Sequence, residues 1–219
     1  MSIGVEHDKG MSNNLSMLPR TLLLARHGET DWNRSRRLQG HTDIPLNDLG
    51  RRQAHRLADR LAGSDIAAIQ ASDLVRAAET AKILGEALGL EPALQSAWRE
   101  IDLGDLEGQD GVETTRAHGE LISAAARADG PLGRGGESFR DFHARIVAGY
   151  ERICRDHADR TVLLVSHGGT LKALIAHLIG LDPVQIGRLS LRGNTSLSTL
   201  DFQHGRPQLT LLNCTSHLE

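Results

Sequence analysis

Short apolar runs along this chain alternate with longer stretches in which apolar residues recur every three or four positions. The short runs predict buried strands at 21–24, 66–71, 92–94 and 161–165. The longer stretches predict helices at 51–62, 74–88, 138–157 and 170–179. Ser72 or Asp73 can cap the second helix, Gly89 ends it, and Ser138 caps the third.

Strands that alternate with helices in this way are typical of a parallel sheet covered on both faces. Two further strands, at 195–202 and 206–212, predict a hairpin through their connection at 203–206. We therefore expect an α/β fold, a three-layer α/β/α sandwich with a mostly parallel sheet and an antiparallel edge.

The rhythm is interrupted at 104–136, where eight glycines surround an alanine-rich stretch at 123–128. We interpret 104–136 as a small cap insertion with one short helix. Residues 1–19 are polar and lack the apolar core of a signal peptide, so we expect a disordered N-terminal tail. Residues 20–219 then form a single domain, whose size allows one hydrophobic core.

The composition excludes several classes of protein. A net charge of −3 and an aromatic content of 3% give neither the basic field nor the stacking platforms of a nucleic-acid-binding protein. No stretch approaches the ~20 apolar residues that span a bilayer. Cys154 and Cys214 are far apart and lack metal-ligand spacing, so we expect reduced thiols in a cytoplasmic protein.

Reactive side chains follow each of the four predicted parallel strands. Arg26 and His27 end the first strand, Arg76 follows the second, Glu100 the third and His167 the fourth. Ligands of open α/β sheets bind outside the carboxyl ends of the strands, so we expect these side chains to gather at that edge.

These residue types suit the transfer of a phosphoryl group. Two arginines supply paired donors for a tetrahedral anion, one histidine can attack phosphorus while the other donates to its oxygens, and a carboxylic acid can protonate the departing oxygen. The attacking imidazole has to be neutral, and the charges of Arg26 and Arg76 lower the pKa of His27 in that direction.

Five ordered blocks resemble the histidine phosphatase superfamily, also called phosphoglycerate mutase-like. The first reads Leu-Ala-Arg-His-Gly-Glu-Thr-Asp-Trp-Asn at 24–33 and continues with Leu-Gln-Gly-His-Thr-Asp-Ile-Pro-Leu at 38–46. The others lie at 72–81, 99–108, 135–138 and 166–169. The resemblance covers about residues 21–213.

The resemblance implies a role for each matching position. His27 would take the phosphoryl group as a phosphohistidine, and Glu100 would act as general acid for the leaving group and then as general base for water. Arg26, Arg76 and His167 would hold the phosphoryl oxygens. Further phosphate- or substrate-binding positions are Asn33, Gln39, Gly40 and Gly168.

The resemblance leaves three functions open: a phosphatase, an isomerase of the phosphoglycerate mutase type, and an inactive binding module of the same fold. Mutase-type relatives usually have Gly-Trp where this chain has Gly40-His41, and Glu-Arg-x-Tyr-Gly where it has residues 99–104. These differences and the short insertion favour a metal-independent phosphomonoesterase that acts on small phosphorylated metabolites.

We expect no cofactor and no metal, because the remaining histidines lack ligand spacing. The expected partner is a small phosphorylated metabolite, drawn in by rim charges at Arg34, Arg36 and Arg37, and an exposed sheet edge near the hairpin is compatible with a homodimer. His217 is a weaker candidate for the site. The motifs account for recognition of the phosphoryl group but not of the rest of the substrate. The substrate can therefore be a phosphosugar, a phosphoglycerate, phosphoserine or ribazole phosphate.

Overall fold

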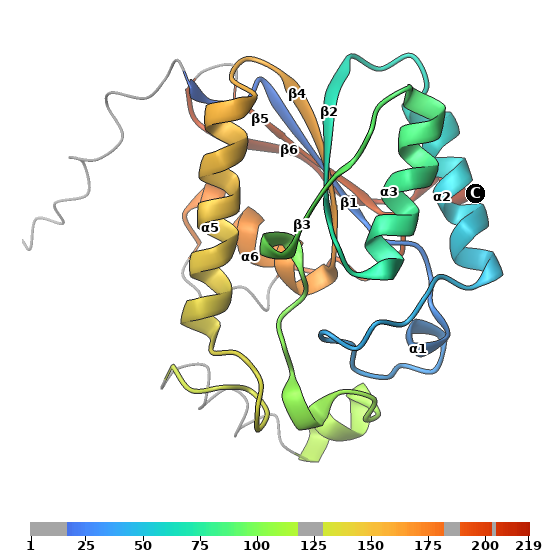
Figure 1. Ribbon diagram of the computed structural model, residues 1–219, viewed down its shortest axis with the longest axis vertical. Helices are drawn as coiled ribbons and strands as arrows, with labels where there is room; N and C mark the ends of the chain where they lie inside the picture. The colour runs from blue at the N-terminus through green and yellow to red at the C-terminus, as the bar shows by residue number, and fades with distance from the viewer. Residues whose placement is uncertain (1–16, 118–128, 182–188, 203–204) are drawn as a thin grey trace, which may run out of the picture.

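The sheet carries the architecture of this molecule. The computed structural model describes residues 17–117, 129–181, 189–202 and 205–219 (Figure 1). Six strands of this part form one sheet in the order β3-β2-β4-β1-β5-β6. The parallel strands are β1 (Thr21–Arg26), β2 (Ile66–Ser72), β3 (Ala93–Gln95) and β4 (Thr161–Ser166). The antiparallel edge consists of β5 (Leu197–Asp201) and β6 (Gln208–Cys214), which confirms the predicted mixed sheet.

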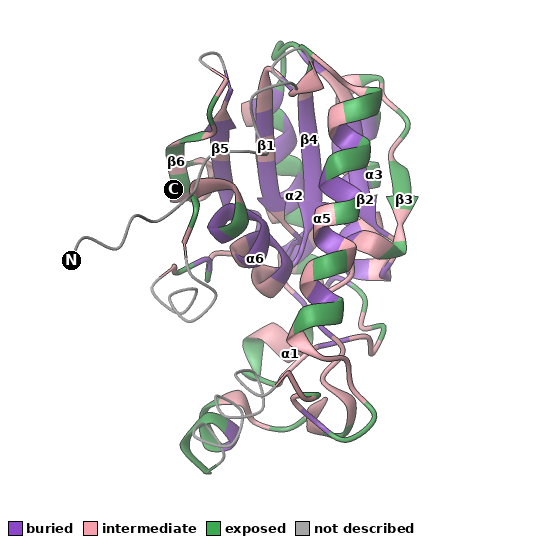
Figure 2. Cartoon of the chain, turned by 90° about the vertical axis from the view of Figure 1, so that its left-hand side faces the viewer, coloured by how far each residue is buried: buried purple, intermediate pink, exposed green. Residues whose placement is uncertain are grey.

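Two pairs of helices cover the two faces of the sheet. Helices α2 (Asp48–Leu61) and α3 (Val75–Leu88) pack on one face, and α5 (Phe139–Asp156) and α6 (Gly168–Ile179) pack on the other. Their inward sides and the central strands are buried, whereas the outer sides are exposed (Figure 2). The expected three-layer α/β/α sandwich is therefore confirmed.

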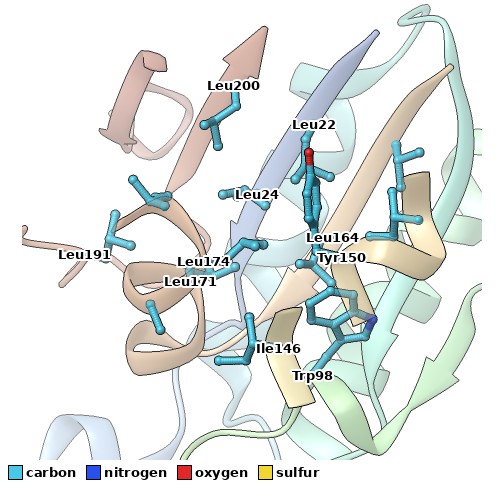
Figure 3. Packing of buried hydrophobic residues seen from close by; sticks show 14 of the residues in the cluster. Leu22, Leu24, Trp98, Ile146, Tyr150, Leu164, Leu171, Leu174, Leu191 and Leu200 are labelled. Atoms are coloured by element: carbon cyan, nitrogen blue, oxygen red, sulfur yellow. The ribbon is translucent and has the colours of Figure 1, made fainter. Parts of the chain in front are cut away.

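Alternation along the strands divides the core in two. Leu22 and Leu24 of β1 point toward α5 and α6, where they pack with Ile146 and Leu174 (Figure 3). Ala25, one position further along, points to the opposite face and packs in the cluster formed with α2 and α3. Both helix pairs are thus fixed to the same central strands.

The N-terminus of α3 differs from the prediction. Its N-cap is Leu74, which makes no side-chain capping bond, rather than Ser72 or Asp73. Both polar side chains have other partners: the Ser72 hydroxyl lies 2.8 Å from His167 Nε2, and the Asp73 carboxylate accepts two hydrogen bonds of 2.7 Å from Arg99. Ser138 does cap α5, by accepting the backbone N–H of Asp141 at 3.1 Å.

The expected cap follows the carboxyl ends of the parallel strands, beside the short helix α1 (Asp31–Arg34) (Figure 1). Its described arms are 104–117, which begins with the turn η3 (Gly104–Leu106), and 129–136. The arms are joined by hydrogen bonds between Asp105 and Arg134. Residues 111–117 of the first arm are helical, whereas the alanine-rich stretch at 123–128 lies outside the described residues.

The described ends of the chain pack against the sheet and its helices. Residues 1–16 of the expected tail lie outside the described residues, whereas Leu18 packs against the larger core cluster and accepts the N–H of Asp159 at 2.9 Å. A single turn, η5 (Ser216–Leu218), follows β6 and contacts α2. No helix in the described ranges is long and apolar enough to cross a membrane.

Candidate active site

A cavity of about 230 Å³ opens at the carboxyl edge of the parallel strands. Its lining contains every residue for which the sequence predicts a catalytic role: Arg26, His27, Arg76, Glu100 and His167. A larger hollow of about 700 Å³ lies on the outer side of α3 and β3 but contains none of these residues. The smaller cavity is therefore the candidate active site.

The pairing of β1 with β4 brings the two histidines together. Arg26 lies opposite Ser166 in the register, so the residues that follow, His27 and His167, leave neighbouring strands at the same level. The His27 N–H continues the ladder by donating to Ser166 O at 2.9 Å. The imidazole ring centres lie 5.2 Å apart.

His27 is held as a neutral imidazole with one nitrogen committed. Its Nδ1 lies 2.7 Å from Gly28 O, and because a carbonyl can only accept, Nδ1 carries the proton. Nε2 then keeps its lone pair. Burial is the largest cause that lowers the pKa of His27 well below its usual value, followed by the charges of Arg76 and Arg26. The predicted direction is correct, but burial outweighs the two arginines.

His167 is buried beside His27. Its Nε2 lies 2.8 Å from the Ser72 hydroxyl, while its buried Nδ1 has no hydrogen-bond partner among the described residues. Burial, followed by the charge of Arg76, lowers the pKa of His167 well below its usual value. Nδ1 is therefore available to a ligand.

The two arginines are fixed through their outer nitrogens. Arg76 is fully buried and donates to Gly40 O at 2.8 Å and to Thr42 O at 3.0 Å. Arg26 donates to Arg192 O at 2.6 Å. The Nε–H of each is buried and unpaired within the described part of the chain. Burial lowers the pKa of Arg76 to about 10, so the guanidinium stays charged at neutral pH.

Three buried nitrogens, Arg26 Nε, Arg76 Nε and His167 Nδ1, therefore lack protein partners around one small cavity. Buried polar groups are almost always paired with protein or ordered water, so three such groups in one place mark a site that a ligand or water fills. The oxygens of a tetrahedral anion are suitable acceptors, and bonds from charged donors are the stronger kind.

Glu100 is held at the first turn of α6. Its carboxylate accepts the backbone N–H groups of Gly169 at 2.8 Å and Thr170 at 3.2 Å, and that of Ile101 at 3.0 Å. A Cβ built on Gly169 would collide with this carboxylate, so a side chain at this position would displace the Glu100 carboxyl group. Gly169 lines the cavity, whereas the predicted Gly168 lies one position before it, beside Arg26.

The other predicted binding positions divide into two groups. Asn33 and Gln39 line the cavity. Gly40 is not among the lining residues; its carbonyl holds Arg76 from behind. His217 also lies outside the lining, with Nε2 at 3.1 Å from the Thr195 hydroxyl and Nδ1 at 3.3 Å from Arg60 Nη1.

Asn194 is a site residue that sequence reasoning missed. Its side-chain amide donates to His27 O at 3.2 Å and to Asn33 Oδ1 at 3.1 Å, so it ties the backbone of His27 to helix α1. Asn194 lies in an aperiodic polar stretch before β5, where no hydrophobic pattern marks it. Its only sequence signal is a position next to a strand that pairs with β1.

The donor set is suited to an anion rather than a cation. Within the described ranges, no group of three or more His, Cys, Asp or Glu side chains is placed to hold a metal ion. A neutral imidazole, two arginines and a carboxyl group around one cavity are the parts that phosphoryl transfer through a histidine requires. Fold and site together are suited to phosphoryl transfer.

The family model of the histidine phosphatase superfamily (branch 1) matches residues 22–215, and the chain belongs to that family. A probable phosphoglycerate mutase of Yersinia enterocolitica is 38% identical over 187 residues, which is 83% of this chain and 85% of the relative.

Two solved structures are similar over most of their length. A mycobacterial glucosyl-3-phosphoglycerate phosphatase in complex with VO3 superposes with a TM-score of 0.79 at 35% identity, covering 89% of this chain and 99% of that one. A phosphoserine phosphatase of Entamoeba histolytica in complex with 3-phosphoglyceric acid has a TM-score of 0.80 at 32% identity, covering 92% and 100%.

Proposed function

We propose that this protein is a metal-independent phosphomonoesterase that hydrolyses small phosphorylated metabolites through a phosphohistidine on His27. One observation carries the proposal: His27 is buried and neutral, with its protonated Nδ1 bound to Gly28 O, and faces a cavity with three unpaired buried donors. The free Nε2 is the nucleophile, and the donors bind the oxygens of the phosphoryl group.

In the first step, His27 Nε2 attacks phosphorus and the bond from phosphorus to the leaving oxygen breaks. The carboxyl group of Glu100 gives its proton to that oxygen, which departs as an alcohol. Arg26, Arg76 and His167 stabilise the charge on the transferring oxygens. In the second step, Glu100 takes a proton from water, the water oxygen attacks phosphorus, and the bond to Nε2 breaks.

The mouth of the cavity favours a second anionic group on the substrate. Arg37 lines it, donates to Gly108 O at 2.7 Å, and has no salt bridge to an acidic group among the described residues. The volume of about 230 Å³ limits the leaving group to a small molecule. Phosphoserine and phosphoglycerates, which appear in the names of the similar phosphatases, carry a carboxylate that suits Arg37.

A mutase is the second candidate, because one relative is named a probable phosphoglycerate mutase and another a phosphoglycerate mutase-like protein. The chemistry up to the phosphohistidine is the same for both. In a mutase, the second hydroxyl of a phosphoglycerate rather than water accepts the phosphoryl group.

A panel of phosphoserine, phosphoglycerates, phosphosugars and an aryl phosphate, assayed with EDTA present, distinguishes the candidates. The phosphatase releases inorganic phosphate, with the highest kcat/KM for a carboxylate-bearing substrate. Interconversion of phosphoglycerates without phosphate release, stimulated by a bisphosphoglycerate, would establish the mutase instead. Loss of all turnover in EDTA with recovery on adding a divalent ion would refute metal independence.

A further inference from the structure

The Gly135-Gly136-Glu137-Ser138 block has no part in the chemistry described above. Glu137 lies outside the cavity lining and forms a salt bridge with Arg145 of α5. The pairing is bidentate, with Arg145 Nε 2.8 Å from Glu137 Oε1 and Arg145 Nη2 2.7 Å from Oε2. Both side chains are largely buried, which makes this pair unlike the exposed ion pairs of the surface.

Arg145 binds the segment that ends at Glu100. Its Nη1 donates to Ala97 O at 3.0 Å and to Arg99 O at 2.7 Å, and its Nη2 donates to Glu100 O at 2.7 Å. This segment begins in the turn η2 (Ser96–Trp98), outside the sheet, so its carbonyls have no ladder partners. Arg145 supplies donors that the strand geometry does not, together with the Thr170 hydroxyl, which donates to Arg99 O at 2.8 Å, and His41 Nε2, which lies 2.9 Å from Glu100 O.

Glu137 holds the far side of the same segment. Its Oε2 accepts the N–H of Asp102 at 3.0 Å, and its own N–H donates to Asp102 O at 3.0 Å. Glu100 therefore lies between two backbone anchors that belong to one ion pair. The Glu100 side chain is in turn held by the first turn of α6.

Helix α5 fixes the start of this segment as well. Trp98 is fully buried and packs against Ile146 and Tyr150 (Figure 3). A Cβ built on Gly149 would lie 2.9 Å from the Trp98 indole, so the helix approaches this closely only because residue 149 is glycine. The Arg145 guanidinium stacks 5.0 Å from the Phe142 ring centre, which limits its movement.

We propose that the Glu137–Arg145 pair is a positioning device that places the Glu100 carboxyl group for proton transfer to the leaving oxygen. Arg145 is not among the residues that line the cavity; it reaches Glu100 through the backbone carbonyl, and its charge also helps to lower the pKa of His167. This inference rests on the proposed function, in which Glu100 is the general acid.

Arg145→Lys tests the inference, since it keeps the positive charge but cannot reproduce a bidentate pair together with three carbonyl contacts. The readout is kcat/KM, which covers the steps up to phosphoryl transfer, for two substrates. An alkyl phosphate needs a proton on its leaving oxygen, whereas an aryl phosphate with an acidic phenol does not. We expect kcat/KM to fall about 30-fold for the alkyl ester and less than about 3-fold for the aryl ester.

Two further variants keep the test independent of folding. Glu137→Gln keeps the shape of the partner. It should also lower kcat/KM selectively for the alkyl ester, but by a smaller factor of about 5. Arg152→Lys is the matched control, because Arg152 is exposed on the same helix and, within the described part of the chain, its side chain hydrogen-bonds to Gln95 alone, at 3.3 Å. Both esters should react with it at the wild-type rate.

The outcomes separate the inference from the proposed function. Equal losses for both esters in Arg145→Lys and Glu137→Gln would overturn the positioning role while leaving the phosphatase intact. In a Glu100→Gln background, Arg145→Lys should cost less than about 2-fold, because its effect passes through the missing acid. If Glu100→Gln itself loses both esters equally, Glu100 is not the acid, and both the acid role and this inference are wrong.

Discussion

At the scale of single residues, burial decides the protonation of the site. The sequence predicted a lowered pKa for His27 from the two arginines, and the structure adds a larger cause, desolvation, which also acts on His167. The sequence shows which charged residues lie near His27, but it does not show how much water the folded cavity excludes. The same burial leaves Arg26 Nε, Arg76 Nε and His167 Nδ1 dependent on a ligand for hydrogen bonds.

The lowered pKa of His27 predicts a pH dependence of stability. In the unfolded chain, the His27 side chain takes up a proton near pH 6.5, whereas the folded state resists this protonation. The free energy of unfolding therefore decreases as the pH drops below that value. One such group contributes up to about 1.4 kcal/mol per pH unit in this window. Between pH 7 and 5, His27→Asn should therefore lose less stability than the wild type in denaturant titrations.

The control for this measurement is His55→Asn, because His55 is exposed on α2. It should follow the wild-type pH dependence. Parallel curves for the wild type and His27→Asn would show that His27 is not held neutral by the fold.

At the scale of elements, the strands and helices were predictable, but the side-chain hydrogen bonds that connect them were not. Short apolar runs and helical periodicity located β1, β4, α5 and α6 to within a few residues. The pattern failed at the start of α3, where Ser72 and Asp73 bind His167 and Arg99 instead of capping. Contacts between residues far apart in the sequence have no periodic signal, which is also why Asn194 was missed.

Glu107 makes another set of hydrogen bonds between residues that are far apart in the sequence. Its carboxylate accepts the backbone N–H groups of His41 and Thr42, each at 2.7 Å, and the Thr42 hydroxyl. The loop at 40–42, to which His41 and Thr42 belong, also supplies the carbonyls that accept hydrogen bonds from Arg76. Burial acts to raise the pKa of Glu107, but the hydrogen bonds from Thr42 and His41 outweigh it and the pKa is lowered.

We expect Glu107→Gln to weaken the loop and, with it, the placement of Arg76. An amide has one accepting oxygen and cannot take all of these bonds, so unfolding free energy should fall by about 1–3 kcal/mol. KM for an aryl phosphate should rise at least several-fold at a temperature where the variant is folded. An unchanged KM would separate the loop from phosphate binding.

At the scale of the whole molecule, one sheet edge collects groups from four distant segments. The order β2-β4-β1 places the ends of three parallel strands next to each other, so residues as far apart as His27 and His167 meet. The sequence predicted this edge because strand ends carry the reactive residues. The arms of the cap beside it could be located only by their glycines, since they have no repeating hydrophobic pattern.

Because the site holds unpaired buried donors, an oxyanion should stabilise the whole fold. A ligand that binds only the folded state adds about 2.7 kcal/mol at a concentration of 100 times its Kd. Vanadate, with chloride at equal ionic strength as the control, should raise Tm by several degrees. Arg76→Met should abolish this increase, and an equal increase in that variant would place the anion elsewhere.

The central claim is a covalent phosphoryl group on His27, and trapping it is the most direct test. The protein is mixed with an aryl phosphate, quenched in alkali within one turnover, digested and sequenced by mass spectrometry. We predict one phosphoryl group on the His27 peptide, labile in acid, and none in His27→Ala, which should also lose turnover while keeping its fold. Turnover by the wild type with no phosphorylated His27, or retained turnover in His27→Ala, would contradict the account.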